Sequence, residues 1–313
     1  MKSLTKKIPL LPFLIIAFLL PLFVHPYLTL ILLLCYIFII YSMGWNLLQL
    51  SGQISIGHSV FFGIGAYVAT LSSFGVSPWL LIPLGALVSS LIATPIGVLC
   101  CRLRGWFLSL VTFAFPLVMY ALCHSFEAFG GSLGFPIKTV PDISSALQLY
   151  YLCLSLMISV LVIVYTIVKM TKIGLAFEAI KQDEGAAECL GINIVKYKIL
   201  AFNMSTFLSG MAGVLYAFNS GWISPDIFMV WYSVLPALIC ALGGMESFEG
   251  PIVGTFIYML AWESLRKIHP VLGTLTLGCF MILLIVFVPE GVPKILSALS
   301  SVLRGGKGNA RGK

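Results

Sequence analysis

The sequence predicts an all-α membrane protein with about ten transmembrane helices, formed as a single domain over residues 1–313. Charged residues make up only 9% of the chain and hydrophobic residues 60%. Soluble domains carry roughly 25% charged residues, so this chain cannot cover a water-facing surface. Its mean hydropathy is +1.07, and no polar stretch is long enough to close a second core of its own.

Ten apolar runs are the expected spans, because about 20 apolar residues cross the hydrocarbon of a bilayer. They are residues 8–24, 28–44, 58–74, 79–101, 106–124, 147–168, 199–219, 231–243, 251–264 and 271–289. The first run follows a basic head, as a signal peptide does, but it lacks an A-x-A cleavage site. We therefore expect it to be retained as a span.

The basic residues indicate how these spans are oriented. If Lys2, Lys6 and Lys7 lie in the cytoplasm, ten crossings place the loop 169–198 and the flexible basic tail 304–313 there as well. The basic residues left on the outer side are Lys138, Arg266 and Lys267. This arrangement obeys the positive-inside rule. We therefore expect a multi-pass protein of the cell (inner) membrane with both termini in the cytoplasm. The net charge of +7 then reflects orientation in the bilayer rather than binding to nucleic acid.

Patterns typical of enzymes and metal proteins are absent from the sequence. The eight cysteines are scattered without a C-x-x-C pair, and the four histidines form no H-E-x-x-H motif. There is no G-x-x-x-x-G-K-[ST] phosphate-binding loop, so the chain is not expected to hydrolyse ATP. We predict no catalytic residues, no metal site and no cofactor bound by this chain. An integral-membrane enzyme acting on lipid is a weaker alternative, as is an ATP-independent channel or carrier.

An island of charge interrupts the apolar runs at residues 169–193. Residues 173–182 can form one short helix, and Asp183 is a suitable N-cap for a second. Gly191 can end that second helix in the left-handed conformation. Two short helices joined by a bend form a knob on the membrane face. The small alanines at the bend would let a partner approach closely, so the knob could be a docking surface. It could equally be a plain solvated connector, and spacing alone does not favour either.

Two irregular stretches, residues 46–57 and 242–254, lie between spans, and each is followed by a glycine-bearing apolar run. Irregular backbone survives at membrane depth only where protein or a water-filled path covers it. Paired interruptions of this kind favour an inverted repeat, as in transporters. Buried polar residues here and in the span 199–219 are candidates for a translocation path, although hydrogen bonds between helices explain them too. The candidates are Asn46, Gln53, Ser55, His58, Asn203 and Ser205.

Small residues mark places where helices can pack closely rather than a binding site. They cluster in two spans, as Gly63, Gly65 and Ala66 in the first and Gly210, Ala212 and Gly213 in the second.

Three ordered blocks resemble a known family. They are GWNLLQLSGQISIGHSVFFGIGAY at residues 44–67, the charged loop at residues 174–193, and LGGMESFEGP at residues 242–251. They are similar to the LivM/LivH-type permease subunits of bacterial ABC importers for branched-chain amino acids. The chain departs from that family at Leu175 and Lys181, where arginine is common, and at Glu246 and Phe248, which interrupt a glycine-rich block.

The resemblance implies a type II ABC importer-like fold and a set of partners. These are ABC ATPase subunits that bind ATP and magnesium, a second homologous permease subunit forming a heterodimer, and a periplasmic or extracellular substrate-binding protein. It also implies that the charged loop holds the helices that couple to the ATPase. The implied coupling residues are Glu178, Lys181, Asp183, Glu184, Gly185, Ala186, Ala187 and Gly191. Relatives for other small solutes, such as urea, share these motifs.

Overall fold

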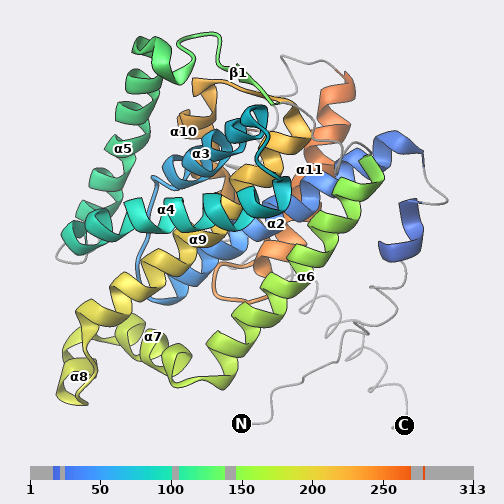
Figure 1. The fold of residues 1–313 in the computed structure, drawn as a ribbon. Helices are drawn as coiled ribbons and strands as arrows, with labels where there is room; N and C mark the ends of the chain where they lie inside the picture. Colours follow the sequence, from blue (N-terminus) through green and yellow to red (C-terminus); the bar gives the residue numbers. More distant parts are fainter. Residues whose placement is uncertain (1–16, 22–24, 101–105, 138–145, 269–277, 279–313) are drawn as a thin grey trace, which may run out of the picture.

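The computed structural model describes residues 17–21, 25–100, 106–137, 146–268 and 278, and within these ranges the fold is built almost entirely of helices (Figure 1). The helices are α2 (Pro26–Leu50), α3 (Ser59–Val68), α4 (Pro78–Cys100), α5 (Trp106–Ser125), α6 (Ala146–Met170), α7 (Lys172–Gln182), α8 (Glu184–Cys189), α9 (Ile194–Ser220), α10 (Val230–Gly243) and α11 (Gly250–Ile268). The short 3-10 helices are η1 (Ala69–Phe74), η2 (Glu127–Phe129) and η4 (Pro225–Phe228).

Five of the described helices are long and apolar enough to cross a membrane. They are α2, α4, α6, α9 and the Phe107–Ser125 part of α5, and the shorter apolar helices Ser59–Phe74 and Val230–Gly243 accompany them. Each expected span from 28–44 to 251–264 is helical over most of its length. The expected span 271–289, apart from residue 278, and the basic tail 304–313 lie outside the described residues, as does most of 8–24.

Helix α9 lies at the centre of the molecule and packs against α2, α3 and α4. The approach of α3 to α9 is so close that side chains are excluded. A Cβ atom on Gly65 would lie 2.0 Å from the Gly210 carbonyl oxygen, and one on Gly213 would lie 1.9 Å from the Phe62 carbonyl oxygen. The prediction that these glycines serve close helix packing is therefore confirmed.

Burial separates the inner helices from the outer ones. Within their most apolar windows, 72% of α2 and 67% of α9 is buried, against 28–39% for α4, α5 and α6. Large apolar side chains such as Leu91, Phe107 and Val162 project from these outer helices. An apolar exterior of this kind suits lipid tails rather than water.

The two ends of the helix bundle differ in structure. At one end, the short helices α7 and α8 join the ends of α6 and α9 (Figure 1). At the other end, β1 (Phe135–Pro136) pairs antiparallel with β2 (Trp222–Ile223), and the indole Nε1 of Trp222 donates to the Leu133 carbonyl at 2.9 Å. Gly130, Gly131 and Gly134 have positive φ in this turn-rich loop, as its glycine content predicted.

Candidate functional site

The α7–α8 segment (residues 171–193) is held in shape by its own caps. The Thr171 hydroxyl accepts from the Ile173 amide at 3.2 Å and starts α7. Asp183 ends α7, and its carboxylate accepts from the Ala186 amide at 3.0 Å to start α8. Gly191 follows α8 with φ of 80°. The two helices, the Asp183 cap and the left-handed glycine all confirm the sequence prediction.

We expect Asp183→Ala to loosen α8 without changing the rest of the fold. Loss of an N-cap costs about 0.5–2 kcal/mol, which corresponds to a roughly 2- to 30-fold faster hydrogen exchange of the α8 amides. Asp183→Asn is the matched control, because asparagine also caps helices well. Equal acceleration in both variants would contradict the capping role.

The inner face of α7 fixes the segment against the bundle. The chain turns so sharply after α6 that a Cβ on Gly174 would lie 2.0 Å from the Val168 carbonyl oxygen. Phe177 is buried and its ring meets Tyr197 of α9 edge-on, with centroids 6.4 Å apart. These contacts pack α7 against the ends of α6 and α9.

The outer face of the segment combines small and apolar side chains. Leu175 and Leu190 are 68% and 79% exposed, and Ala186 is exposed between them in sequence. Ala187, however, is only 1% exposed and packs inward. Of the other predicted coupling residues, Glu178, Asp183, Gly185 and Gly191 are exposed, whereas Lys181 and Glu184 are half-buried.

The chain between α2 and α3, residues 51–58, forms the first break. Helix α2 continues to Leu50, so the irregular stretch is shorter than the 46–57 expected from the sequence, and Asn46 is helical. Side chains satisfy the backbone of the break: Trp45 Nε1 donates to the Ser55 carbonyl at 2.8 Å, and Ser109 Oγ to the Ile54 carbonyl at 3.0 Å. Protein thus covers most of this irregular stretch, whereas Gly52 and Ile54 are exposed.

The second break, residues 244–249, joins α10 to α11. It is also shorter than the 242–254 expected, because α10 reaches Gly243 and α11 begins at Gly250. Its first residue, Gly244, has φ of 101°. The Asn46 side chain donates from Nδ2 to the Met245 carbonyl at 3.1 Å. Asn46 therefore ties α2 to this second break.

Both breaks meet the α7–α8 segment at Lys181. A Cβ on Gly52, which has φ of 82°, would lie 3.1 Å from the Lys181 Cα. The Lys181 ammonium forms an ion pair with Glu246 of the second break at 3.1 Å. Lys181 thus contacts two stretches that lie far apart in the sequence, a contact that no local pattern predicts.

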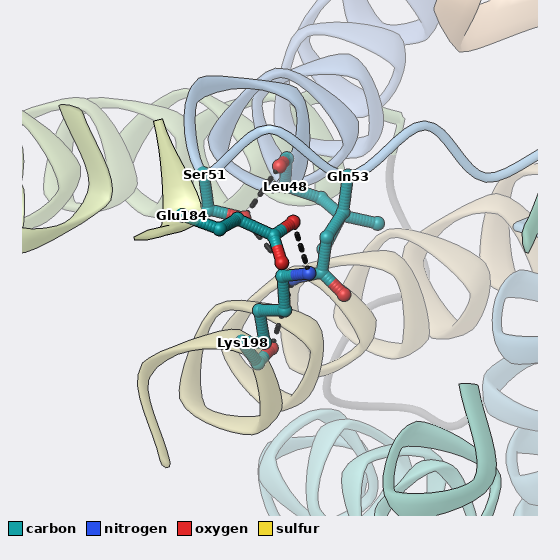
Figure 2. A network of polar contacts seen from close by, with 5 residues as sticks. All are labelled: Leu48, Ser51, Gln53, Glu184 and Lys198. Carbon is teal, nitrogen blue, oxygen red and sulfur yellow. Dashed lines mark hydrogen bonds and ion pairs between the residues drawn. The ribbon is translucent and has the colours of Figure 1, made fainter. Parts of the chain in front are cut away.

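A polar network joins α8, α9 and the first break (Figure 2). The Lys198 side chain is 4% exposed, and its Nζ lies 2.6 Å from Glu184 Oε1. The Lys198 carbonyl accepts from Gln53 Nε2 at 3.0 Å, and the same nitrogen donates to Ser51 Oγ at 3.1 Å. Ser51 Oγ in turn donates to the Leu48 carbonyl at 2.7 Å. Lys198 was not among the predicted site residues. The available signal was that Lys196 and Lys198 open an otherwise apolar helix.

The six predicted path residues divide into two groups. Five are buried within the chain. Among them, His58 Nε2 lies 2.6 Å from Ser205 Oγ, and Ser55 Oγ accepts from the Gly57 amide at 3.2 Å. Asn46 Oδ1 and His58 Nδ1 are buried without a hydrogen-bond partner in the described part of the chain. Asn203 differs, because it lines a cavity of about 320 Å³ between α4, α6 and α9. Its Oδ1 accepts from Thr94 Oγ1 at 3.3 Å.

The walls of this cavity are mainly aliphatic. Leu156, Val160, Ile163 and Met204 line it beside the polar Asn203, and Ser90 and Ser159 add hydroxyls. A larger cavity of about 980 Å³ lies between α3, α4 and α5 and contains none of the predicted site residues. Within the described part of the chain, no group of three or more His, Cys, Asp or Glu residues could hold a metal ion.

Comparisons with known proteins give a consistent result. A family model described as "Branched-chain amino acid transport system / permease component" matches residues 27–289. The chain is 29% identical over 289 residues to the high-affinity branched-chain amino acid transport system permease protein LivM of Salmonella typhimurium, and 28% identical to that of Escherichia coli. Both alignments cover 82% of this chain and 67% of the relative.

A more distant similarity reaches an archaeal protein. The probable branched-chain amino acid transport permease protein LivH of Methanocaldococcus jannaschii is 24% identical over 208 residues, covering 62% of this chain and 65% of the relative. No solved structure matches.

Proposed function

Because the chain belongs to the branched-chain amino acid transport system permease family, we propose that it imports branched-chain or related amino acids into the cytoplasm. Membership of this family makes it a multi-pass transporter subunit rather than an enzyme. Energy comes from ATP hydrolysed by partner ABC ATPase subunits, since no phosphate-binding loop occurs in this sequence. The relatives named LivM and LivH support this substrate class over urea or another small solute.

The observation that carries the proposal is the two-sided character of the α7–α8 segment. Its outer face presents Leu175, Ala186 and Leu190 to solvent. Its inner face is fixed to α9 and touches both breaks through Lys181. A solvated connector needs neither an apolar outer face nor a rigid inner one. We propose that the ATPase binds the outer face and that the inner face transmits its movement.

We propose further that the whole chain crosses the membrane ten times, as an inverted repeat of the type II importer kind. The two interrupted helix pairs, α2–α3 and α10–α11, support the repeat, since each contains a short break with a positive-φ glycine near its start, Gly52 in the first and Gly244 in the second. The basic residues favour a cytoplasmic position for the α7–α8 segment and for both termini.

For the solute, we propose a path that runs beside Asn203. The cavity there lies between α6 and α9, which are the two helices that the α7–α8 segment joins. Its volume of about 320 Å³ is at the lower end of the ~300–1,000 Å³ of small-molecule sites, and its aliphatic walls with a few polar groups suit a leucine-like side chain. Asn46, Gln53, Ser55, His58 and Ser205 then hold the walls of the path in place.

A second permease subunit would complete the path across a dimer interface. We propose that this partner is a homologous chain and that a substrate-binding protein docks on the end that carries β1 and β2. That end is opposite the α7–α8 segment (Figure 1), as delivery and energy input from opposite sides of a membrane require.

Isolation of the native complex tests this function. The tagged chain, purified in mild detergent, is expected to bring an ABC ATPase with it. After reconstitution with the binding protein, the complex should take up radiolabelled leucine when ATP is present on the ATPase side, and urea should not compete. Uptake that needs no ATP, or a complex without an ATPase, would refute the proposal.

A further inference from the structure

Lys198 is a buried cation outside any proposed solute path. It lies near the start of α9 with a side chain only 4% exposed, and Glu184 at 2.6 Å is its ion-pair partner. Burying an ammonium is unfavourable unless a partner of opposite charge compensates it at close range. The position of Glu184 at the first residue of α8 is therefore coupled to the position of α9.

The backbone of Lys198 also connects α9 to the first break. The Lys198 carbonyl accepts from Gln53, and Gln53 donates to Ser51, so the beginning of the first break is bonded to α9 (Figure 2). The end of that break is bonded to α9 as well, through His58 and Ser205 at 2.6 Å. The break is thus held to α9 at both ends, and an ion pair links α9 to α8.

We propose that Glu184 and Lys198 are positioning residues, forming the link through which displacement of α8 moves α9 and the first break together. This inference rests on the proposed function, because it assumes that a partner displaces α8. The ion pair does not touch the solute. Its role is to keep the break in register with the α7–α8 segment while the transporter changes conformation.

The second ion pair of the segment provides a natural comparison. Lys181 and Glu246 are 28% and 84% exposed, and exposed ion pairs contribute little because water and salt screen them. Breaking the Lys181–Glu246 pair should therefore affect transport much less than breaking Glu184–Lys198, although both pairs reach a break.

Glu184→Gln in the full complex tests the link, with the number of solute molecules moved per ATP hydrolysed as the readout. We expect this ratio to fall at least tenfold while the ATPase still assembles and hydrolyses ATP. Glu246→Gln, which breaks the exposed Lys181–Glu246 pair, is the matched control and should keep a ratio close to that of the wild type. A merely structural role would lower assembly rather than the ratio.

Combining variants separates a specific link from general damage. The effect of Glu184→Gln with Lys198→Met should not exceed that of Lys198→Met alone, because one contact is lost in either case. Equal ratios for Glu184→Gln and Glu246→Gln, or multiplicative losses in the double variant, would overturn the proposal.

If the Glu184→Gln variant fails to assemble with the ATPase, a variant in which the two charges are exchanged tests the link instead. Glu184→Lys with Lys198→Glu retains an ion pair, and recovery of the ratio in that variant supports the link. Failure of the exchanged pair to assemble, or assembly without coupling, overturns it. A wild-type complex without ATP-driven uptake would instead refute the proposed function itself.

Discussion

Replacing Ala186 by arginine is expected to abolish ATP-driven uptake while leaving the permease folded. Ala186 is exposed on α8, so the new side chain extends into solvent rather than into the core. Forcing a bulky side chain into a closely packed interface costs about 1–3 kcal/mol, a loss of roughly 5- to 160-fold in affinity for the ATPase. Co-purification of the ATPase with the tagged variant measures this loss.

Two further alanines provide controls for this variant. Ala128→Arg makes the same change on an exposed residue in η2, far along the chain, and should retain the ATPase fully. Ala187→Arg should fail differently, because that side chain is 1% exposed and arginine would force the segment off the bundle. If the Ala186→Arg variant retained the ATPase fully, α8 would not be part of the docking surface.

Gly65→Ala is expected to have the largest effect on stability. The added methyl carbon would lie 2.0 Å from the Gly210 carbonyl oxygen, well inside van der Waals contact. The obstacle is the backbone of α9, which cannot rotate away as a side chain would. We expect destabilisation above the ~1–3 kcal/mol of ordinary overpacking, measured as a lower melting temperature and a lower yield of monodisperse protein in detergent.

The same substitution elsewhere is the control for this prediction. Gly185 lies within α8, where an added Cβ would meet only the Asp183 carboxylate at 3.3 Å. Gly185→Ala should leave the melting temperature unchanged or raise it, because alanine favours a helix by about 0.5–1 kcal/mol. A normal melting temperature for Gly65→Ala would mean that α3 and α9 do not cross as closely as described.

Local features of the chain were predictable because their causes are local. The bend at Asp183, the left-handed Gly191 and the packing glycines of α3 and α9 each follow from the chemistry of one or two residues. Helix positions followed from apolar runs, since the bilayer permits few other structures.

Features that depend on distant contacts were not predictable from one sequence. The polar side chains of Asn46 and Gln49 suggested irregular backbone, yet α2 continues to Leu50 and the Asn46 side chain bonds to Met245 in the second break. Ala186 and Ala187 are identical by type, and only packing against the bundle distinguishes the exposed one from the buried one. The burial of Lys198 likewise depends on Glu184, which reaches it from a separate helix.

Cross-linking from Cys189 tests most directly whether the α7–α8 segment is the ATPase docking surface. Cys189 is exposed on α8, whereas the other cysteines in the described residues are buried. With Cys101 and Cys279 replaced by serine, a photoactivatable reagent on Cys189 should capture an ABC ATPase subunit in native membranes, and Ala186→Arg should prevent that capture. Capture of lipid or of the substrate-binding protein, with no ATPase adduct, would contradict the docking surface proposed here.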